Sequence, residues 1–277
     1  MLIKMKQILL VSIFFTLMSC NKNLKSISNQ TLPTTEIYPK NLGNKNNTWV
    51  FILAGQSNMA GRGMIEPQDT IYSERILTIN KSGKIVLAKE PLHFYEPSRT
   101  GLDCGLSFGK TLHKNIPDSI TILLVPTAVG GSSISQWIGD STYRNVQLLT
   151  NFTERVNIAK KYGTVKGILW HQGEADANEK DVVLYKMHLT TLIDKFRKII
   201  DNNNLPVLIG ELGSYSDNQF YYSLINEQIE SYISTDTNAF LISTKDLKDK
   251  GDKVHFNSTG QRLLGKRFAK AYLAMMK

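Results

Sequence analysis

Cysteine is almost absent from this sequence of 277 residues, which contains only Cys20 and Cys104. A framework of disulfide bonds, on which many small secreted domains depend, is therefore excluded. Hydrophobic residues make up 42% of the chain and charged residues 21%, proportions typical of a soluble globular protein. A chain of this length buries a sizeable core without covalent cross-links, and we expect one α/β domain behind an N-terminal segment.

A basic stripe interleaved with aromatic residues is also missing. The formal net charge is +9, but +5 of it falls within residues 1–46, which leaves +4 for the rest of the chain. Such a modest and scattered excess does not favour binding to nucleic acid, because that function depends on clustered Lys and Arg side chains. We therefore expect no nucleic-acid partner.

Long apolar runs are lacking as well. The N-terminal run from Ile8 to Met18 is too short for a comfortable membrane span, and Lys4 and Lys6 precede it. This pattern is typical of a targeting segment rather than of a folded element.

The same segment ends in Leu17-Met18-Ser19-Cys20, which resembles the lipobox of bacterial lipoproteins. The resemblance implies a signal peptide over residues 1–19, cleavage before Cys20, and transfer of diacylglycerol to its sulfur. Residues 20–46 are rich in Asn, Lys, Ser and Thr, and they predict a flexible tether. The expected protein is exported and anchored to a membrane, either periplasmic or on the cell surface. An ordinary signal peptide and a short anchor helix are the alternatives.

From residue 47 onward, short apolar runs alternate with stretches of helical periodicity. The predicted strands are Trp49–Leu53, Ile120–Pro126, Val165–Trp170, Pro206–Glu211 and Ala239–Ser243. The predicted helices are Leu106–Lys114, Tyr143–Lys161, Val182–Ile200, Phe220–Ile233 and Ser258–Leu273. This alternation predicts a three-layer α/β/α sandwich with a five-stranded parallel sheet in a single domain, residues 47–277. Residues 76–80 and 85–88 predict a small inserted hairpin.

The segment Gly55-Gln56-Ser57-Asn58-Met59 follows the first predicted strand. Glycine allows a sharp turn there, which lifts the Ser57 hydroxyl out of the sheet. A serine hydroxyl is a poor nucleophile near neutral pH, so it needs a base. His255 is the candidate base, and Asp252, three residues earlier, is a candidate partner that fixes the imidazole.

Two further polar segments also follow predicted strands. Gly130-Gly131-Ser132 comes after the second strand, and His171-Gln172-Gly173-Glu174 comes after the third. Loops at the carboxyl ends of parallel strands meet at one edge of a sheet. We therefore expect an oxyanion hole made by the N–H groups of Ser57, Gly130 and Gly131 and by the Gln172 amide.

Glu174 leaves the acid of the triad open. It competes with Asp252 as the partner of His255, or it supports its loop or contacts substrate. A metal site at His171, Glu174 and Asp176 is conceivable, but their spacing matches no trusted motif, so we expect neither a metal nor another cofactor. Cys104 has no assigned base and is interpreted as structural.

The order Gly-Gln-Ser-Asn-Met-Ala-Gly, Gly-Gly-Ser, Trp-His-Gln-Gly-Glu-Ala-Asp and Asp-x-x-His resembles the SGNH hydrolase superfamily. More closely, it is similar to the carbohydrate acetylesterase branch, which includes family six acetylxylan esterases and sialate O-acetylesterases. The resemblance spans residues 48–275. It implies a flavodoxin-like fold, the Ser57 and His255 pair, and the oxyanion donors named above. Gln172 stands where the superfamily usually has Asn, as it does across this branch.

The resulting hypothesis is a serine esterase that removes O-acetyl groups from carbohydrates, either xylan-type oligosaccharides or O-acetyl sialic acid. Gln56, Asn58, Tyr95 and Trp137 are the predicted substrate contacts, the last two because aromatic rings stack on sugars. An SGNH thioesterase or lysophospholipase, and a non-catalytic glycan-binding lipoprotein, are the rival hypotheses.

Overall fold

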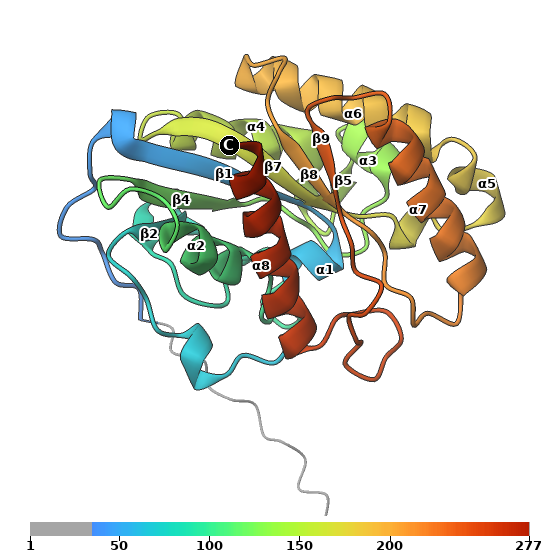
Figure 1. The fold of residues 1–277 in the computed structure, drawn as a ribbon, viewed down its shortest axis with the longest axis horizontal. Coiled ribbons are helices and arrows are strands. Elements are labelled where there is room, and N and C mark those ends of the chain that lie inside the picture. The colour runs from blue at the N-terminus through green and yellow to red at the C-terminus, as the bar shows by residue number, and fades with distance from the viewer. Residues whose placement is uncertain (1–34, 277) are drawn as a thin grey trace, which may run out of the picture. The chain divides into compact units, whose positions relative to one another are not determined.

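A seven-stranded sheet runs through the part of the protein that the structure describes, residues 35–276 of a computed structural model (Figure 1). The strand order is β3-β2-β4-β1-β7-β8-β9, and every neighbouring pair is parallel except β2 and β3. The strands are β1 (Thr48–Gly55), β2 (Ile76–Ile79), β3 (Ile85–Leu87), β4 (Thr121–Pro126), β7 (Thr164–His171), β8 (Val207–Gly210) and β9 (Ala239–Ile242). A separate hairpin pairs β5 (Thr142–Tyr143) with β6 (Val146–Gln147).

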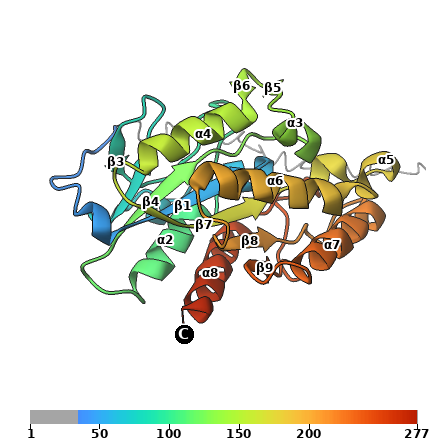
Figure 2. The same ribbon diagram turned by 90° about the horizontal axis from the view of Figure 1, so that it is seen from above.

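Helices cover both faces of the sheet (Figure 2). The helices are α1 (Ser57–Ala60), α2 (Gly105–His113), α3 (Ile134–Ile138), α4 (Leu148–Ala159), α5 (Glu179–Val182), α6 (Tyr185–Ile200), α7 (Gln219–Ile233) and α8 (Ser258–Met275), with short 3₁₀ turns η1 (Lys45–Asn47), η2 (Pro67–Asp69) and η3 (Glu174–Asp176). Helices α3, α4, α6 and α7 pack on one face, and α1, α2 and α8 pack on the other. The predicted three-layer α/β/α architecture is confirmed.

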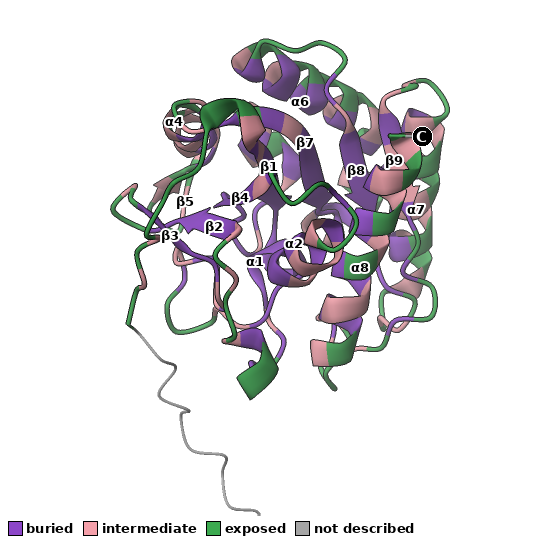
Figure 3. Cartoon of the chain, turned by 60° about the vertical axis from the view of Figure 1, so that its left-hand side comes forward, coloured by how far each residue is buried: buried purple, intermediate pink, exposed green. Residues whose placement is uncertain are grey.

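Side-chain alternation along β1 explains the two layers. Val50 and Ile52 point into the core under α4 and α6, whereas Phe51 and Leu53 point into the core under α2 and α8. All four are fully buried, so the central strand is apolar on both sides, as expected for a covered parallel sheet (Figure 3). Burying one such side chain contributes about 1.5–3 kcal/mol.

Two predicted elements differ from the structure. The sheet has seven strands rather than five, because the predicted hairpin joins its edge: β2 pairs in parallel with β4, and β3 pairs with β2. The helix predicted over residues 143–161 begins only at Leu148, since Arg144 and Asn145 adopt positive φ angles of 48° and 61° in the β5–β6 turn. A right-handed helix cannot contain such residues.

Most of the predictions for the N-terminal segment concern residues that the structure does not describe. The predicted signal peptide (residues 1–19) and the predicted lipidation site Cys20 fall outside the described residues. Within the described range, ordered contacts begin before residue 47, because the Leu87 N–H donates to the Ile37 carbonyl at 2.8 Å and Ile37 packs on the core. None of the helices over residues 35–276 combines the length and apolar character needed to span a membrane.

Candidate active site

The turn after β1 brings Ser57 to the carboxyl edge of the sheet. Gly55 has φ +136°, and a Cβ atom there would lie 2.1 Å from the His171 carbonyl oxygen. Only glycine therefore fits beside the end of β7, where the Gln56 N–H donates to the same oxygen at 3.0 Å. The chain then enters α1 with Ser57 as its first residue, and this serine lines a pocket of about 430 Å³.

His255 reaches Ser57 from the loop between β9 and α8. Its Nε2 lies 2.9 Å from Ser57 Oγ, although 198 positions separate the two residues in sequence. Its Nδ1 lies 2.7 Å from Asp252 Oδ2. The nucleophile, the base and the acid thus form a continuous chain of hydrogen bonds, the arrangement that activates a serine hydroxyl.

The Asp252 carboxylate is held in its ionised form. Partial burial raises its pKa, but hydrogen bonds from the His255 side chain and from the backbone N–H groups of His255 and Val254 outweigh this effect and lower the pKa to about 2. An anion beside Nδ1 keeps the proton on that nitrogen and leaves Nε2 free to accept the serine proton.

Asn58 joins the serine turn to the histidine loop. Its Nδ2 donates to the Val254 carbonyl at 3.0 Å, and its Oδ1 accepts the Phe256 N–H at 3.0 Å. Both neighbours of His255 are therefore fixed by one side chain, which is 1% exposed. This burial corrects the prediction that Asn58 contacts substrate: its bonds position the base instead.

Glu174 is not the partner of His255 in this structure. Its Oε1 accepts from Asn58 Nδ2 at 2.6 Å and lies 3.7 Å from His171 Nδ1. Burial lowers the pKa of His171, while Glu174 raises it, and the net shift is downward. His171 also bonds locally, since its Nε2 lies 2.9 Å from the Glu211 carbonyl oxygen. Of the two candidate acids, Asp252 has the geometry of a triad member.

Two of the four predicted oxyanion donors are already occupied. The Gly130 N–H donates to Glu96 Oε2 at 2.7 Å. The Gln172 amide, fully buried, lies within hydrogen-bond distance of Gln56 Oε1, the Ser132 carbonyl and Asp176 Oδ2. These contacts correct the prediction for Gly130 and Gln172. The N–H groups of Ser57 and Gly131 line the pocket and have no acceptor among residues 35–276, so they are the available pair.

Gln172 and Asp176 form a polar layer beneath the pocket. Asp176 accepts from the Gln172 amide and from the Ile134 N–H, which follows the Gly130 turn. Tyr185 donates its hydroxyl to Gln172 Oε1 at 3.0 Å. The Gln56 Oε1 atom also belongs to this layer, because it accepts a hydrogen bond from the Gln172 amide. Gln56 still lines the pocket, but at 3% exposure it serves mainly to connect loops.

The wall opposite the histidine is built from arginines. Arg62 donates to Glu96 Oε2 at 2.7 Å, and Arg144 lies 2.9 Å from Glu96 Oε1. A Cβ atom on Gly130 would lie 2.1 Å from the Arg62 guanidinium, so any larger residue would displace the Arg62 and Glu96 side chains from this position. Arg99 lines the same pocket and has no ion-pair partner within the described range.

Sequence reasoning missed this wall. Arg62 directly follows the Gly55–Gly61 segment, which was its only available signal. Glu96 sits in a loop without periodicity, Arg144 falls within a stretch predicted as helix, and their pairing depends on contacts across 48 positions of sequence. Tyr222, from α7, completes the lining and was likewise not predicted.

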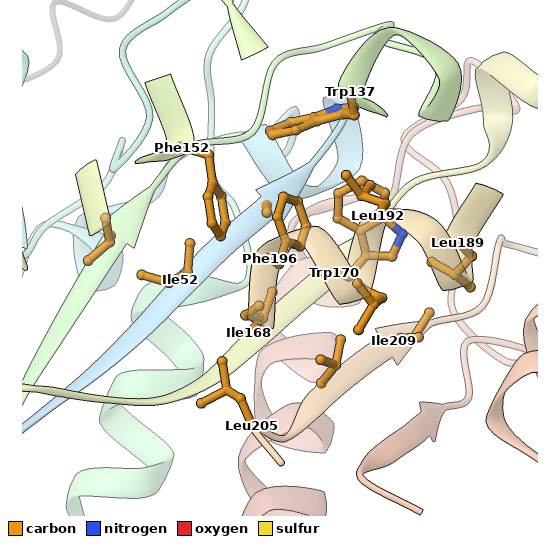
Figure 4. Close-up of a cluster of buried hydrophobic side chains, with 14 of the residues drawn as sticks. Ile52, Trp137, Phe152, Ile168, Trp170, Leu189, Leu192, Phe196, Leu205 and Ile209 are labelled. Atoms are coloured by element: carbon orange, nitrogen blue, oxygen red, sulfur yellow. The ribbon is translucent and has the colours of Figure 1, made fainter. Parts of the chain in front are cut away.

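Both predicted aromatic contacts lie elsewhere. Trp137 is fully buried, packs edge-to-face on Trp170 and Phe196, and donates its indole N–H to Ser132 Oγ at 2.9 Å (Figure 4). It is a core residue and cannot stack on a sugar. Tyr95 donates its hydroxyl to the Pro126 carbonyl and lies on a second pocket, not on the pocket of Ser57.

Cys104 is buried, and its Sγ lies 3.7 Å from Met59 Sδ. Burial, together with the charges of Asp103 and Glu90, raises the pKa of its thiol well above the usual value. It is an unreactive packing residue, in line with its interpretation from sequence. Over residues 35–276, no cluster of three or more His, Cys, Asp and Glu side chains is arranged to hold a metal ion.

Comparison with known proteins supplies the family. The family model for carbohydrate esterases described as sialic acid-specific acetylesterases matches residues 47–274. A probable carbohydrate esterase of Arabidopsis thaliana is 30% identical over 249 residues, which cover 81% of this chain and 90% of that protein. All the polar loops described above lie inside the matched segment.

Solved structures give the same fold. An X-ray structure of an Arabidopsis thaliana protein superposes with a TM-score of 0.74 at 28% identity, covering 83% of this chain and 98% of the other. The structure of NanS gives a TM-score of 0.68 at 19% identity, with 84% and 98% covered. On the match of the family model across residues 47–274, the chain belongs to the sialic acid-specific acetylesterase family of carbohydrate esterases.

Proposed function

We propose that this protein is a serine esterase that releases acetate from O-acetylated carbohydrates. The observation that carries the proposal is the chain of hydrogen bonds from Ser57 Oγ to His255 Nε2 at 2.9 Å and from His255 Nδ1 to Asp252 at 2.7 Å, inside a pocket. Membership of a family of carbohydrate esterases supports the choice of a sugar ester over other acyl compounds.

The first half of the proposed reaction forms an acetyl-enzyme. Ser57 Oγ attacks the acetyl carbon while His255 Nε2 takes the hydroxyl proton, and Asp252 stabilises the resulting imidazolium. The negative charge that develops on the carbonyl oxygen is directed to the N–H groups of Ser57 and Gly131. The bond to the sugar oxygen then breaks, and His255 returns the proton to that oxygen, which leaves as a hydroxyl group.

The second half restores the serine. A water molecule gives its proton to His255 and attacks the acetyl carbon, and the bond to Ser57 Oγ breaks as the proton passes to that oxygen. Acetate is released. A preorganised pair of N–H donors is worth about 10²–10³-fold in rate for each donor.

The charges on the arginine side of the pocket favour an acidic sugar, whereas Glu174, the carboxylate of the pocket lining, is bound to Asn58 Nδ2 at 2.6 Å. Arg62 and Arg144 share the single carboxylate of Glu96, and Arg99 has no ionic partner within residues 35–276. A carboxylate on the substrate is the complement of this excess, because guanidinium binds carboxylate in a planar, two-point fashion. We therefore place O-acetyl sialic acid ahead of acetylated xylan as the substrate class.

The direct test is acetate release from O-acetyl sialic acid and from acetylated xylan. We expect wild type to act faster on the acidic sugar, and Ser57→Ala to lower kcat by about 10⁴-fold or more. Ser119→Ala, at an exposed serine before β4, is the matched control and should behave as wild type. Acetate release from neither glycan by a folded protein would refute the proposal, and cleavage of octanoyl esters instead would favour the thioesterase or lysophospholipase.

We also propose that the protein is exported and held on a membrane through lipid on Cys20. The support is the Leu17-Met18-Ser19-Cys20 segment after a short apolar run. In cells fed labelled palmitate, the wild-type protein should carry label and sediment with membranes. Cys20→Ser should lose both properties, whereas retention of label and sedimentation would exclude this anchor.

A further inference from the structure

A second pocket borders the pocket of Ser57. Its volume is about 520 Å³, and its lining includes Phe94, Tyr95, Arg144, Asn145, Asn151 and Arg155. Arg144 lines both pockets, so the two are neighbours. Each falls within the range of about 300–1,000 Å³ that is typical of ligand sites. The acetyl ester chemistry needs only the first pocket, and the proposed mechanism leaves the second one unused.

The second pocket combines an aromatic surface with hydrogen-bonding groups. The centroid of the half-buried Phe94 ring lies 4.6 Å from the centroid of the Tyr95 ring. The Arg155 guanidinium lies over the Phe94 ring, 5.0 Å from the Phe94 centroid. Aromatic rings offer apolar faces to the C–H groups of a sugar. Amide, guanidinium and carboxylate groups around the rim match sugar hydroxyls, which both donate and accept hydrogen bonds.

One donor in this pocket lacks a partner. Asn151 Oδ1 lies 3.0 Å from the Tyr95 hydroxyl oxygen, whose single proton is shared between this amide and the Pro126 carbonyl at 3.1 Å. Its Nδ2 is buried and has no hydrogen-bond partner within the described residues. Leaving such a donor unpaired costs about 1–3 kcal/mol, and a rotation of the Asn151 side chain toward the pocket would let a ligand hydroxyl remove that cost.

The boundary between the two pockets is built under strain. Arg144 and Asn145 form the β5–β6 turn, which lies between α3 and α4 (Figure 2), and both have left-handed backbones. Such conformations are uncommon outside glycine and cost about 1 kcal/mol or more each. The turn directs Arg144 to Glu96, which also holds the Gly130 N–H beside the reactive serine. The surrounding structure thus fixes the side chain that the two pockets share.

We propose that the second pocket is a sugar subsite, which binds the unit glycosidically linked to the acetylated sugar in the Ser57 pocket. This inference rests on the proposed function for the identity of the first sugar. It adds that the preferred substrate is an O-acetylated oligosaccharide rather than a free monosaccharide. The second unit stacks on Phe94 and accepts a hydrogen bond from Asn151 Nδ2.

Binding tests the subsite without catalysis. In the Ser57→Ala protein, calorimetry compares the methyl glycoside of sialic acid with sialyl-galactose, both without O-acetyl groups. We expect the disaccharide to bind about tenfold more tightly, which corresponds to about 1.4 kcal/mol. Adding Phe94→Ala, or Asn151→Asp, which keeps the acceptor but removes the donor, should abolish this advantage. Phe220→Ala, at a phenylalanine on α7 that is 69% exposed, is the matched control and should preserve it.

Kinetics then separates the two proposals. For wild type, kcat/KM should be about tenfold higher for O-acetylated sialyl-galactose than for the O-acetylated methyl glycoside, and Phe94→Ala should bring this ratio near one. Equal binding of both sugars, unaffected by Phe94→Ala, would overturn the subsite even if acetate is released. Tighter disaccharide binding without acetate release from any glycan would support the subsite and refute the esterase function instead.

Discussion

The pocket of Ser57 has two walls of different construction. The triad wall consists of Ser57, Asn58, Glu174, Val254 and His255, and it is braced by short hydrogen bonds through nearly buried side chains. The arginine wall consists of Arg62, Arg99, Gly130, Gly131 and Arg144, and it is braced by one carboxylate, that of Glu96, between two guanidinium groups. The first wall carries the nucleophile and the base, and the second carries the Gly131 N–H donor together with charge suited to recognising an acidic substrate.

The difference between the two walls predicts which kinetic constant a mutation in each wall should change. Changes in the triad wall should lower kcat, because they alter the reacting groups or their positions. Changes to the arginine side chains of the second wall should act chiefly on KM for charged substrates, because their contribution is present in the ground state as well. Four predictions test this division, in addition to the Ser57→Ala experiment.

The largest effect is expected at the acid of the triad. Asp252→Asn should lower kcat by about 10³–10⁴-fold, because the neutral amide no longer fixes the imidazole tautomer. Glu174→Gln should cost only about tenfold, since Glu174 reaches His255 only through Asn58. The assay is p-nitrophenyl acetate hydrolysis, with Asp201→Asn as the surface control. Equal losses in the two variants would contradict the assignment of Asp252.

Asp176 belongs to the buried polar layer with Gln172 rather than to either wall, and its titration should appear in stability. Burial raises its pKa to about 6, although the hydrogen bonds from Gln172 and the Ile134 N–H oppose this shift. The protonated form therefore stabilises the fold below about pH 4, and this contribution is lost as the pH rises through about 6. We expect the free energy of unfolding to fall by roughly 2–3 kcal/mol over this interval.

Urea denaturation of wild type and Asp176→Asn at pH 4, 5, 6 and 7 measures this contribution. The variant lacks the titrating carboxyl group, so its stability should change less over the same range. Parallel profiles for the two proteins would show that Asp176 does not titrate over this range.

Arg99 should affect recognition rather than chemistry. Arg99→Gln should raise KM for O-acetyl sialic acid by about tenfold relative to KM for p-nitrophenyl acetate, because only the first substrate carries a carboxylate. Lys198→Gln, on α6, controls for the change in net charge. Added salt should shrink the difference between wild type and variant, since Arg99 is exposed. A proportional rise in KM for both esters would assign Arg99 to general packing.

The smallest effect on activity is expected at Trp137, which belongs to neither wall. Trp137→Phe should lower the free energy of unfolding by roughly 1–3 kcal/mol, because a buried ring shrinks and the bond to Ser132 Oγ is lost. KM for acetylated sugars should stay the same. A raised KM in a protein of unchanged stability would restore the original interpretation of Trp137 as a sugar-stacking residue.

The two walls also differ in how far sequence could predict them. The serine and histidine segments carry local signals: a glycine turn after an apolar strand, and an Asp three residues before a His. The arginine wall has no such signal, because Arg144 finds Glu96 across 48 positions and becomes part of the pocket only through a strained turn. Periodicity extended the helix over residues 143–161 across that turn, since it does not detect left-handed residues.

The fold also divides into parts that local sequence signals predict and parts that depend on long-range contacts. Continuous apolar runs identified β1, β4, β7, β8 and β9, because a strand covered by helices on its two faces is apolar along its length. Hydrophobicity also identified the residues of β2 and β3. The pairing of β2 with β4, which brings the hairpin into the sheet, depends on tertiary contacts that no local pattern encodes. Trp137 was misplaced for a related reason: aromatic residues near a site motif are equally suited to a core, and only packing decides between the two.

The bonds from Asn58 to both neighbours of His255 have a consequence for biosynthesis. The ribosome synthesises Ser57 198 residues before it synthesises His255. An incomplete nascent chain therefore contains the nucleophile without the base that deprotonates it. Hydrolytic competence arises only when the carboxyl-terminal segment docks onto the serine turn. Truncated translation products are therefore inert, and the onset of turnover reports that synthesis has finished.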